Sequence, residues 1–123
     1  MGDDESNYGE MGLDATNLQA GVNASSPIGA AHSGVQVAFW HAQRTASNAQ
    51  AIFKNGASFV TGSAASVALV NRNFNILAGN NAGVAYQPTT ARLSMAFIGG
   101  SLNGKEAALY GAVRTYLTAV GVA

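Results

Sequence analysis

Hydrophobic and polar positions alternate most clearly between residues 91 and 97. Leu93, Met95 and Phe97 are separated by smaller or polar residues, which is the two-residue period of a half-buried β-strand. Gly99 and Gly100 follow, and this pair predicts the end of the strand because glycine favours turns. We therefore predict a last strand at residues 91–97 that ends in a Gly-Gly turn.

After this turn the apolar residues recur with the period of a helix, which we place at about residues 103–120. Asn103 is the predicted N-cap, and Glu106 stands three residues later, where its carboxylate can accept the N–H of the cap residue. Gly121 is well placed to end the helix. The predicted buried face contains Leu109, Val113, Tyr116, Leu117 and Val120.

The centre of the chain contains a strong hairpin signal. The patterns of residues 49–53 and 57–61 predict two strands, and Asn55 and Gly56 between them accept the positive φ angles of a type I′ turn. Two helical alternatives remain open. One is a short helix over residues 45–54, and the other is a single alanine-rich helix over residues 35–75 in a filament protein.

Turn signals recur every 8–12 residues along the chain, which indicates an all-β fold, an antiparallel β-sandwich closed by the C-terminal helix. Residues 1–12 contain four acids and no periodicity, so we predict a flexible acidic arm before a single domain at residues 13–123. The other predicted strands cover residues 17–23, 34–42, 67–70, 74–78 and 84–86, with loops at residues 28–33, 42–48 and 79–83.

Three segments resemble a known family of β-sandwiches. They are residues 101–110 (SLNGKEAALY) with the strand before them, residues 49–60 (AQAIFKNGASFV) and residues 73–81 (NFNILAGNN). They are similar to the last strand and terminal helix, a hairpin and a Gly/Asn loop of concanavalin A-like (laminin G-like) domains in bacteriophage tail and tail-fibre proteins. The resemblance covers about residues 40–123 and implies a jelly-roll topology, but it contains no catalytic signature.

Charged residues make up only 10% of the 123 residues, compared with roughly 25% in an ordinary soluble domain. Five of the six acids lie at residues 3–14, and the rest of the chain has six Lys and Arg against one acid, a net charge of +5. These cations are scattered singly, which argues against nucleic-acid binding. The chain has no cysteine, and no apolar run approaches the length of a membrane span.

Few residues suit catalysis or metal binding. Glu106 is the only acid after residue 14, whereas a glycosidase needs two carboxyl groups. His32 and His41 lack the spacing of a metal site, and the acidic residues 3–5 lack that of a calcium loop. We therefore predict no enzyme activity, no metal and no cofactor.

Aromatic rings and side-chain amides suit carbohydrate. The candidate glycan-binding rim is formed by Trp40, His41, Asn80, Asn81 and Tyr86.

The sequence thus predicts a non-enzymatic bacteriophage virion protein from the tail, tail fibre or capsid surface. The first thirty residues predict one weak strand where the family begins with several, so either the chain is a piece of a longer protein or neighbouring copies complete the sheets. The expected partners are further copies of the chain, with a trimer as one candidate, other virion proteins and host-surface carbohydrate. The alternative is a polysaccharide-binding lectin module or a polysaccharide-degrading enzyme domain.

Overall fold

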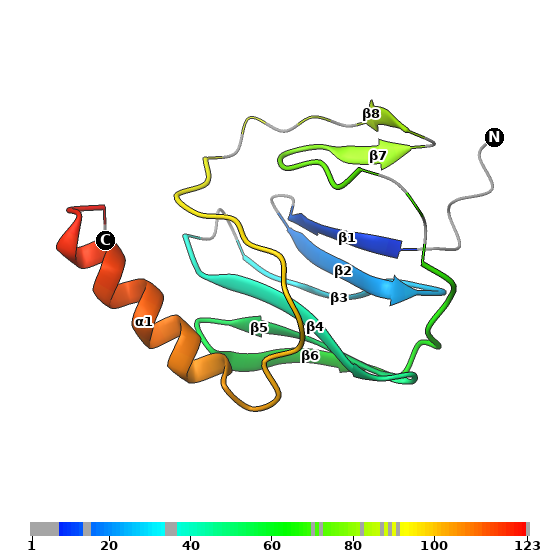
Figure 1. The fold of residues 1–123 in the computed structure, drawn as a ribbon, viewed down its shortest axis with the longest axis horizontal. Helices are drawn as coiled ribbons and strands as arrows, with labels where there is room; N and C mark the ends of the chain where they lie inside the picture. Colours follow the sequence, from blue (N-terminus) through cyan, green and yellow to red (C-terminus); the bar gives the residue numbers. More distant parts are fainter. Residues whose placement is uncertain are drawn as a thin grey trace.

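The computed structural model describes residues 8–13, 16–33, 37–69, 71, 73–81, 83–86, 88, 90 and 92–122. Within these ranges, eight strands form three antiparallel sheets, and one helix follows near the C-terminus (Figure 1). The prediction of a mainly β fold with a C-terminal helix is confirmed.

Each sheet is formed by strands that are consecutive in the chain. The first sheet contains β1 (Tyr8–Leu13), β2 (Asn17–Ala24) and β3 (Ile28–Ala31). The second contains β4 (Trp40–Ala46), β5 (Ala49–Lys54) and β6 (Ala57–Gly62). The third contains the short strands β7 (Gly79–Asn81) and β8 (Val84–Tyr86).

The β5–β6 hairpin forms where the sequence predicts it. Asn55 and Gly56 have φ angles of 54° and 78°, the left-handed conformation that a type I′ turn requires. The backbone N–H of Asn55 donates to the carbonyl of Phe39 (2.8 Å), and its side-chain oxygen accepts the N–H of Phe39 (3.0 Å). The hairpin is therefore confirmed, and both helical alternatives for this region are wrong.

The hydrophobic core lies where the first sheet packs against the second. Leu18 and Ala20 of β2 and Ile52 of β5 are almost completely buried in one cluster. Leu18 and Ala20 are two residues apart, so they point to the same face of β2. Partly buried side chains complete the cluster: Ile28, Trp40, Ala42, Phe59 and Val60.

Two polar side chains of the second sheet bind the backbone of the first. The guanidinium of Arg44 donates to the carbonyl of Val22 in β2 (2.6 Å) and also to that of Ala64, just after β6 of its own sheet (3.0 Å). The amide of Gln50 accepts the N–H of Val22 (3.3 Å) and donates to the carbonyl of Ser26 (3.2 Å). The predicted polar connector at residues 42–48 is wrong for its first five residues, because strand β4 continues to Ala46.

Several strand boundaries differ from the prediction. The strand expected at residues 34–42 begins at Trp40, and residues 34–36 lie outside the described ranges. The expected loop at residues 28–33 contains β3, which pairs with β2. Residues 8–12 of the expected arm belong to β1, and residues 1–7 lie outside the described ranges. Strand β2, by contrast, matches its prediction closely.

Three other segments are not strands where the sequence predicts them. The described residues in the ranges 67–70, 74–78 and 91–97 belong to no strand. Ser66 forms one isolated bridge to Ala24. The expected turn at residues 79–83 instead supplies β7 and the turn into β8, where Gly83 has a φ angle of 92°. Strand β8 is confirmed.

Helix α1 (Glu106–Ala119) begins slightly later than predicted. Asn103 is not its cap: its φ angle is 46°, Lys105 occupies the N-cap position, and no side chain caps the helix there. The predicted end is confirmed. Gly121 has a φ angle of 77°, its N–H donates to the carbonyl of Thr118 (3.1 Å), and the N–H of Val122 donates to that of Leu117 (3.0 Å), which is a Schellman motif.

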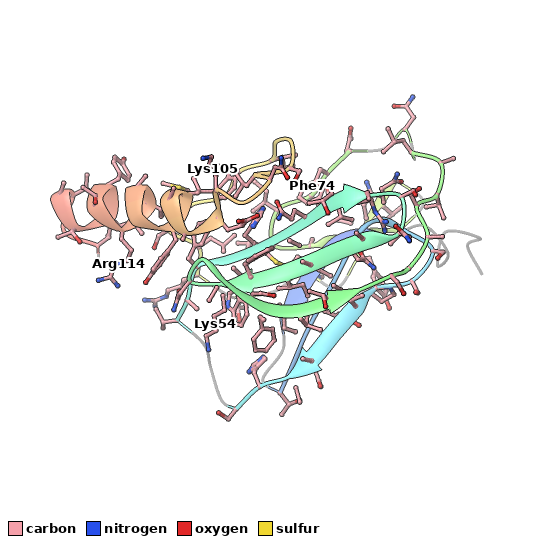
Figure 2. All side chains as sticks on the ribbon, turned by 90° about the horizontal axis from the view of Figure 1, so that it is seen from below. Lys54, Phe74, Lys105 and Arg114 are labelled. Carbon is pink, nitrogen blue, oxygen red and sulfur yellow. The ribbon has the colours of Figure 1, made fainter. Side chains whose placement is uncertain are left out.

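The first half of α1, as far as the buried Val113, lies against the rest of the chain. A side chain at Gly56 would come within 2.8 Å of Ala107 and 3.1 Å of Tyr110, so the hairpin turn supports the first turns of the helix. Figures 1 and 2 both show the rest of α1 extending away from the strands. Among the described residues, no helix has the length and apolar character needed to cross a membrane.

Candidate functional site

The five residues of the predicted glycan rim lie on two different sheets. Trp40 and His41 belong to β4, whereas Asn80, Asn81 and Tyr86 belong to the β7–β8 hairpin. Figure 1 shows β1–β3 between these two places. Trp40 and His41 are consecutive in a strand, so their side chains point to opposite faces of the sheet.

The ring of Trp40 is occupied by contacts within the chain. It packs edge-on against Phe59, with the ring centroids 5.3 Å apart. The ammonium nitrogen of Lys54 lies 5.2 Å from the centre of the Trp40 ring, which is a cation–π contact. This side chain therefore helps to close the core.

His41 lies on the other face of the sheet, among aromatic rings. Its ring centroid is 5.6 Å from that of Phe53 and 6.5 Å from that of Phe97, and the residue is only 8% exposed. Burial lowers the pKa of His41, and the nearby charge of Glu106 opposes this effect in part. The structure thus gives His41 a packing role.

The side chain of Asn80 stabilises the loop that precedes β7 and the turn that follows it. Its amide nitrogen donates to the carbonyl of Asn73 (2.6 Å), and its oxygen accepts the N–H of Gly83 (2.8 Å). Tyr86 is 51% exposed. The side chain of Asn81 lies outside the described part of the structure.

A buried polar junction joins β4 to the start of α1. Gln43 is 5% exposed, and its amide nitrogen donates to the Glu106 carboxylate (2.5 Å). Its oxygen accepts the N–H of Leu102 (2.9 Å) and the hydroxyl of Ser101 (3.2 Å). The sequence gives no sign of this role, because a single glutamine in a polar stretch has no recognisable spacing.

The same junction keeps Glu106 ionised. Its pKa is lowered first by its own backbone N–H, then by the N–H of Gly104 (3.1 Å), while burial opposes the shift; Gln43 and His41 contribute less. A carboxylate held in this way is an acceptor at a helix start. Among the described residues, no group of three acidic or histidine side chains could hold a metal ion.

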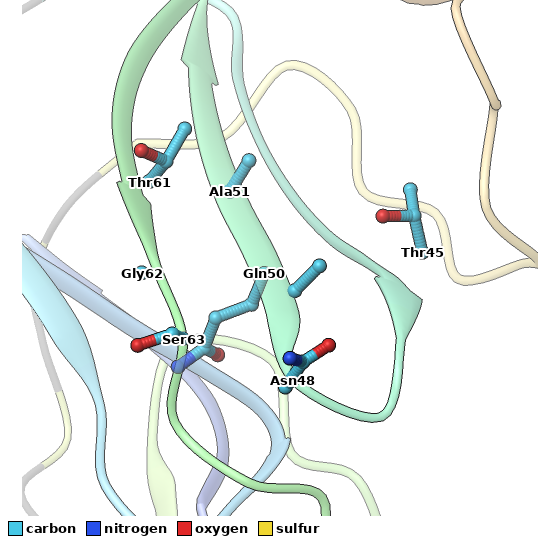
Figure 3. A pocket seen from close by; sticks show the side chains of 8 residues that line it. Thr45, Asn48, Gln50, Ala51, Thr61, Gly62 and Ser63 are labelled. Atoms are coloured by element: carbon cyan, nitrogen blue, oxygen red, sulfur yellow. The ribbon is translucent and has the colours of Figure 1, made fainter.

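An open hollow of about 490 Å³ lies at the other end of the second sheet (Figure 3). The side chains that line it are uncharged, so the hollow offers hydroxyl, amide and methyl groups but no titratable group. The lining includes Thr45, Asn48, Ala49, Ala51, Thr61 and Ser63.

The described surface contains an apolar groove that sequence analysis did not predict. The groove has a volume of about 220 Å³ and is lined by Phe74, Ile76, Ala96, Phe97 and Ile98. Phe74, Ile76 and Ile98 are 59%, 60% and 72% exposed, so the groove is open to solvent. The alternation at residues 93–97 was a signal for this surface, but we expected those side chains to face a core.

A second apolar surface lies on the projecting end of α1. Tyr116 and the C-cap residue Val120 are 56% and 53% exposed, and they lie four residues apart in the chain with the half-buried Leu117 between them. We call these three residues the helix stripe. The helix prediction included them, but it expected them to pack inside the domain.

Comparisons of the chain with known protein families, with curated proteins and with solved structures find no match.

Proposed function

We propose that this chain is a non-enzymatic structural protein of a bacteriophage virion, of the tail or tail-fibre type, that works as an assembly of several copies. The proposed fold is a jelly-roll sandwich of the concanavalin A-like kind, in which further copies cover apolar surface that one copy leaves open. The virion setting rests on the resemblance of residues 49–60, 73–81 and 101–110 to tail-protein domains.

The observation that carries the proposal is the balance of buried and exposed apolar residues. Among the described hydrophobic residues only five are buried: Leu18, Ala20, Ala24, Ile52 and Val113. Fifteen large hydrophobic side chains of the described residues are exposed, and three of them, Phe74, Ile76 and Ile98, line one apolar groove. Contiguous exposed apolar surface is typical of sites that bind another protein.

The chemistry of the polar groups favours a structural role over catalysis. The Glu106 carboxylate accepts hydrogen bonds from Gln43 and Gly104, so it serves as a structural acceptor at the start of the helix. The largest open hollow described above has no titratable lining. A glycan site at the predicted rim stays a prediction, and Trp40 and Tyr86 belong to different sheets.

The proposal is tested by the mass of the full chain in solution. We expect light scattering after size-exclusion chromatography to give a multiple of the chain mass, falling toward one chain on dilution. A chain that stays monomeric at millimolar concentration would contradict the assembly. Incubation with bacterial surface polysaccharide should release no new reducing ends. Release that is lost in Glu106→Gln would contradict the non-enzymatic role.

A further inference from the structure

We propose that the turn before α1 is a self-modification site, at which the backbone nitrogen of Gly104 attacks the side-chain amide of Asn103 and converts this residue to aspartate or isoaspartate. Asparagine is most open to this attack when glycine follows it, because glycine has no side chain to obstruct the approach. The reaction needs water and a single copy of the chain, so it is independent of the proposed assembly.

The chain contains two Asn–Gly pairs, and both occupy the same kind of turn. The φ angles are 54° and 78° at Asn55 and Gly56, and 46° and 88° at Asn103 and Gly104, which are the values of a type I′ turn. A backbone hydrogen bond of 3.1 Å closes the second turn over residues 102–105. Because the two backbones are alike, any difference in reactivity between the pairs must come from their contacts.

The pair in the β5–β6 hairpin is held in place. The side-chain oxygen of Asn55 accepts the N–H of Phe39 (3.0 Å), and its backbone N–H donates to the carbonyl of Phe39 (2.8 Å). On its other side, a side chain at Gly56 would come within 2.8 Å of Ala107. The side-chain carbonyl carbon must rotate onto the next backbone nitrogen to react, so Asn55 first has to break its hydrogen bonds to Phe39.

The pair before α1 is open. Asn103 and Gly104 are both exposed, and a side chain built at Gly104 would meet no atom within 4 Å. In the described part of the chain, no hydrogen bond holds the side-chain amide of Asn103. This amide can therefore rotate toward the attacking nitrogen without losing a contact.

The attacking nitrogen also faces a base. The N–H of Gly104 donates to the carboxylate of Glu106 (3.1 Å). The backbone N–H groups of Glu106 and then of Gly104 lower the pKa of this carboxyl, so it is ionised at neutral pH. An amide nitrogen attacks as its proton leaves, and a carboxylate within hydrogen-bond distance is placed to receive that proton.

The bonds and protons of the reaction balance without an oxidant or a reductant. The nitrogen of Gly104 forms a bond to the side-chain carbonyl carbon of Asn103, and its proton passes to Glu106. The side-chain nitrogen takes up this proton and leaves as ammonia when its bond to carbon breaks, which gives a cyclic imide. Water then opens the imide at one carbonyl to give aspartate, or at the other to give isoaspartate.

The product changes the junction between β4 and α1. Either product adds a carboxylate three residues before Glu106 and lowers the net charge of the chain by one. Isoaspartate also lengthens the main chain next to Leu102, whose N–H donates to the oxygen of Gln43 (2.9 Å). The modification therefore acts on the contacts that hold the start of the helix.

The test compares the two pairs within one sample of the full chain. The folded protein is incubated at mildly alkaline pH and digested with trypsin, and the fragments are analysed by tandem mass spectrometry. Fragment 93–105 contains a single asparagine, so the mass gained when an amide NH₂ becomes OH reports Asn103 directly. We expect Asn103 to react about tenfold faster than Asn55 or more, because opening at Asn55 must break two hydrogen bonds.

The same chain unfolded in urea is the matched control. Without the fold, the two asparagines differ only in their neighbours in sequence, so they should react at similar rates. The isoaspartate form of fragment 93–105 should appear beside the aspartate form, because it can arise only through the cyclic imide. Equal rates at Asn55 and Asn103 in the folded chain would overturn the proposal, as would a folded chain in which Asn103 stays unchanged.

A variant of Glu106 tests the path of the proton. Glu106→Gln keeps an oxygen that can accept the N–H of Gly104, but this oxygen is not a base. The variant should slow the reaction of Asn103 by about tenfold or more in the folded chain and leave the rate in urea unchanged. If the carboxylate only held the turn closed, the variant would react faster than the parent, and this result would overturn its role as the proton acceptor.

Discussion

Two parts of this chain differ in whether their apolar side chains are buried. Between residues 17 and 62, apolar side chains such as Leu18 and Ile52 are buried, and polar ones such as Arg44 and Gln50 bind backbone groups of the facing sheet. Between residues 67 and 98, Leu69, Phe74 and Ile98 are among the large apolar side chains that are mostly exposed.

The alternation of residues does not explain this difference, because both parts alternate apolar residues with small or polar ones. The presence or absence of a neighbouring strand does explain it. Strand β5 has a neighbour on each side, so one of its faces can close a core. The described residues of 92–98 have the same alternation but belong to no strand. Alternation makes a segment suitable for a sheet, but burial requires a partner strand or a covering surface.

The largest expected effect comes from deleting buried volume in the packed part. Ile52 is completely buried, so Ile52→Ala should lower the free energy of unfolding by about 2–5 kcal/mol. The matched change Ile76→Ala, at a residue 60% exposed, should change it by less than about 0.5 kcal/mol in dilute solution. Urea denaturation of both variants measures the contrast. Equal losses would mean that residues 67–98 are packed as tightly as the two sheets.

A second substitution tests the place where the packed part meets α1. Gly56 has a φ angle of 78°, and a side chain there would also strike the backbone of Ala107. Gly56→Val should therefore cost more than about 2 kcal/mol, from backbone strain and from displacement of α1. Gly83 has a φ angle of 92° and open space around it, so Gly83→Val reports the strain alone. If the two losses are the same, α1 does not rest on the hairpin.

The junction between β4 and α1 should contribute a smaller amount. Gln43→Ala removes the donor to Glu106 and leaves the N–H of Leu102 without its acceptor. We expect a loss of about 1–3 kcal/mol, typical of breaking buried hydrogen bonds. Gln19→Ala, at an exposed glutamine of β2, is the control and should be nearly neutral. The measurement is urea denaturation followed by circular dichroism.

The same junction predicts a dependence on pH. The pKa of His41 is lowered by burial, so the unfolded chain takes up a proton more readily, and stability should begin to fall as the pH drops below 6.5. The pKa of Glu106 is also lowered, mainly by its own N–H, so a second loss should begin below about 4.5. Glu106→Gln should flatten the loss below pH 4.5. Stability that rises on acidification would contradict both assignments.

Local signals account for the elements that the sequence predicted well. The turn at Asn55 and Gly56, the helix end at Gly121 and the strand β8 each depend on a few neighbouring residues whose preferences are strong. Strand β3 could not be predicted this way, because the short segment Ile28–Ala31 has no alternation of its own and forms a strand by pairing with β2.

Distant partners also explain what the sequence could not show at the candidate site. The rim prediction grouped Trp40 with Tyr86 because aromatic rings suit carbohydrate, and the structure places them on different sheets. The role of Gln43 depends on Glu106, which is 63 residues away in the chain. A single sequence contains no signal for such a pairing. The exposed groove was missed because alternation cannot show whether a partner strand exists.

The smallest effect on the isolated chain is expected at the groove itself. There, a substitution should change stability only at high protein concentration. Ile98 and Val84 are 72% and 69% exposed, but only Ile98 lines the groove. In dilute solution, Ile98→Ser and Val84→Ser should each change the free energy of unfolding by less than about 0.5 kcal/mol.

At high concentration the two variants should differ in Tm. Association stabilises the folded chain in proportion to the logarithm of partner concentration over the dissociation constant, so the Tm of the parent should rise with concentration. Val84→Ser should keep this rise, and Ile98→Ser should lose most of it. Scanning calorimetry across a hundredfold range of concentration provides the measurement. If both variants keep the full rise, the copies do not meet at the groove, and the exposed residues of 92–98 must be covered in another way.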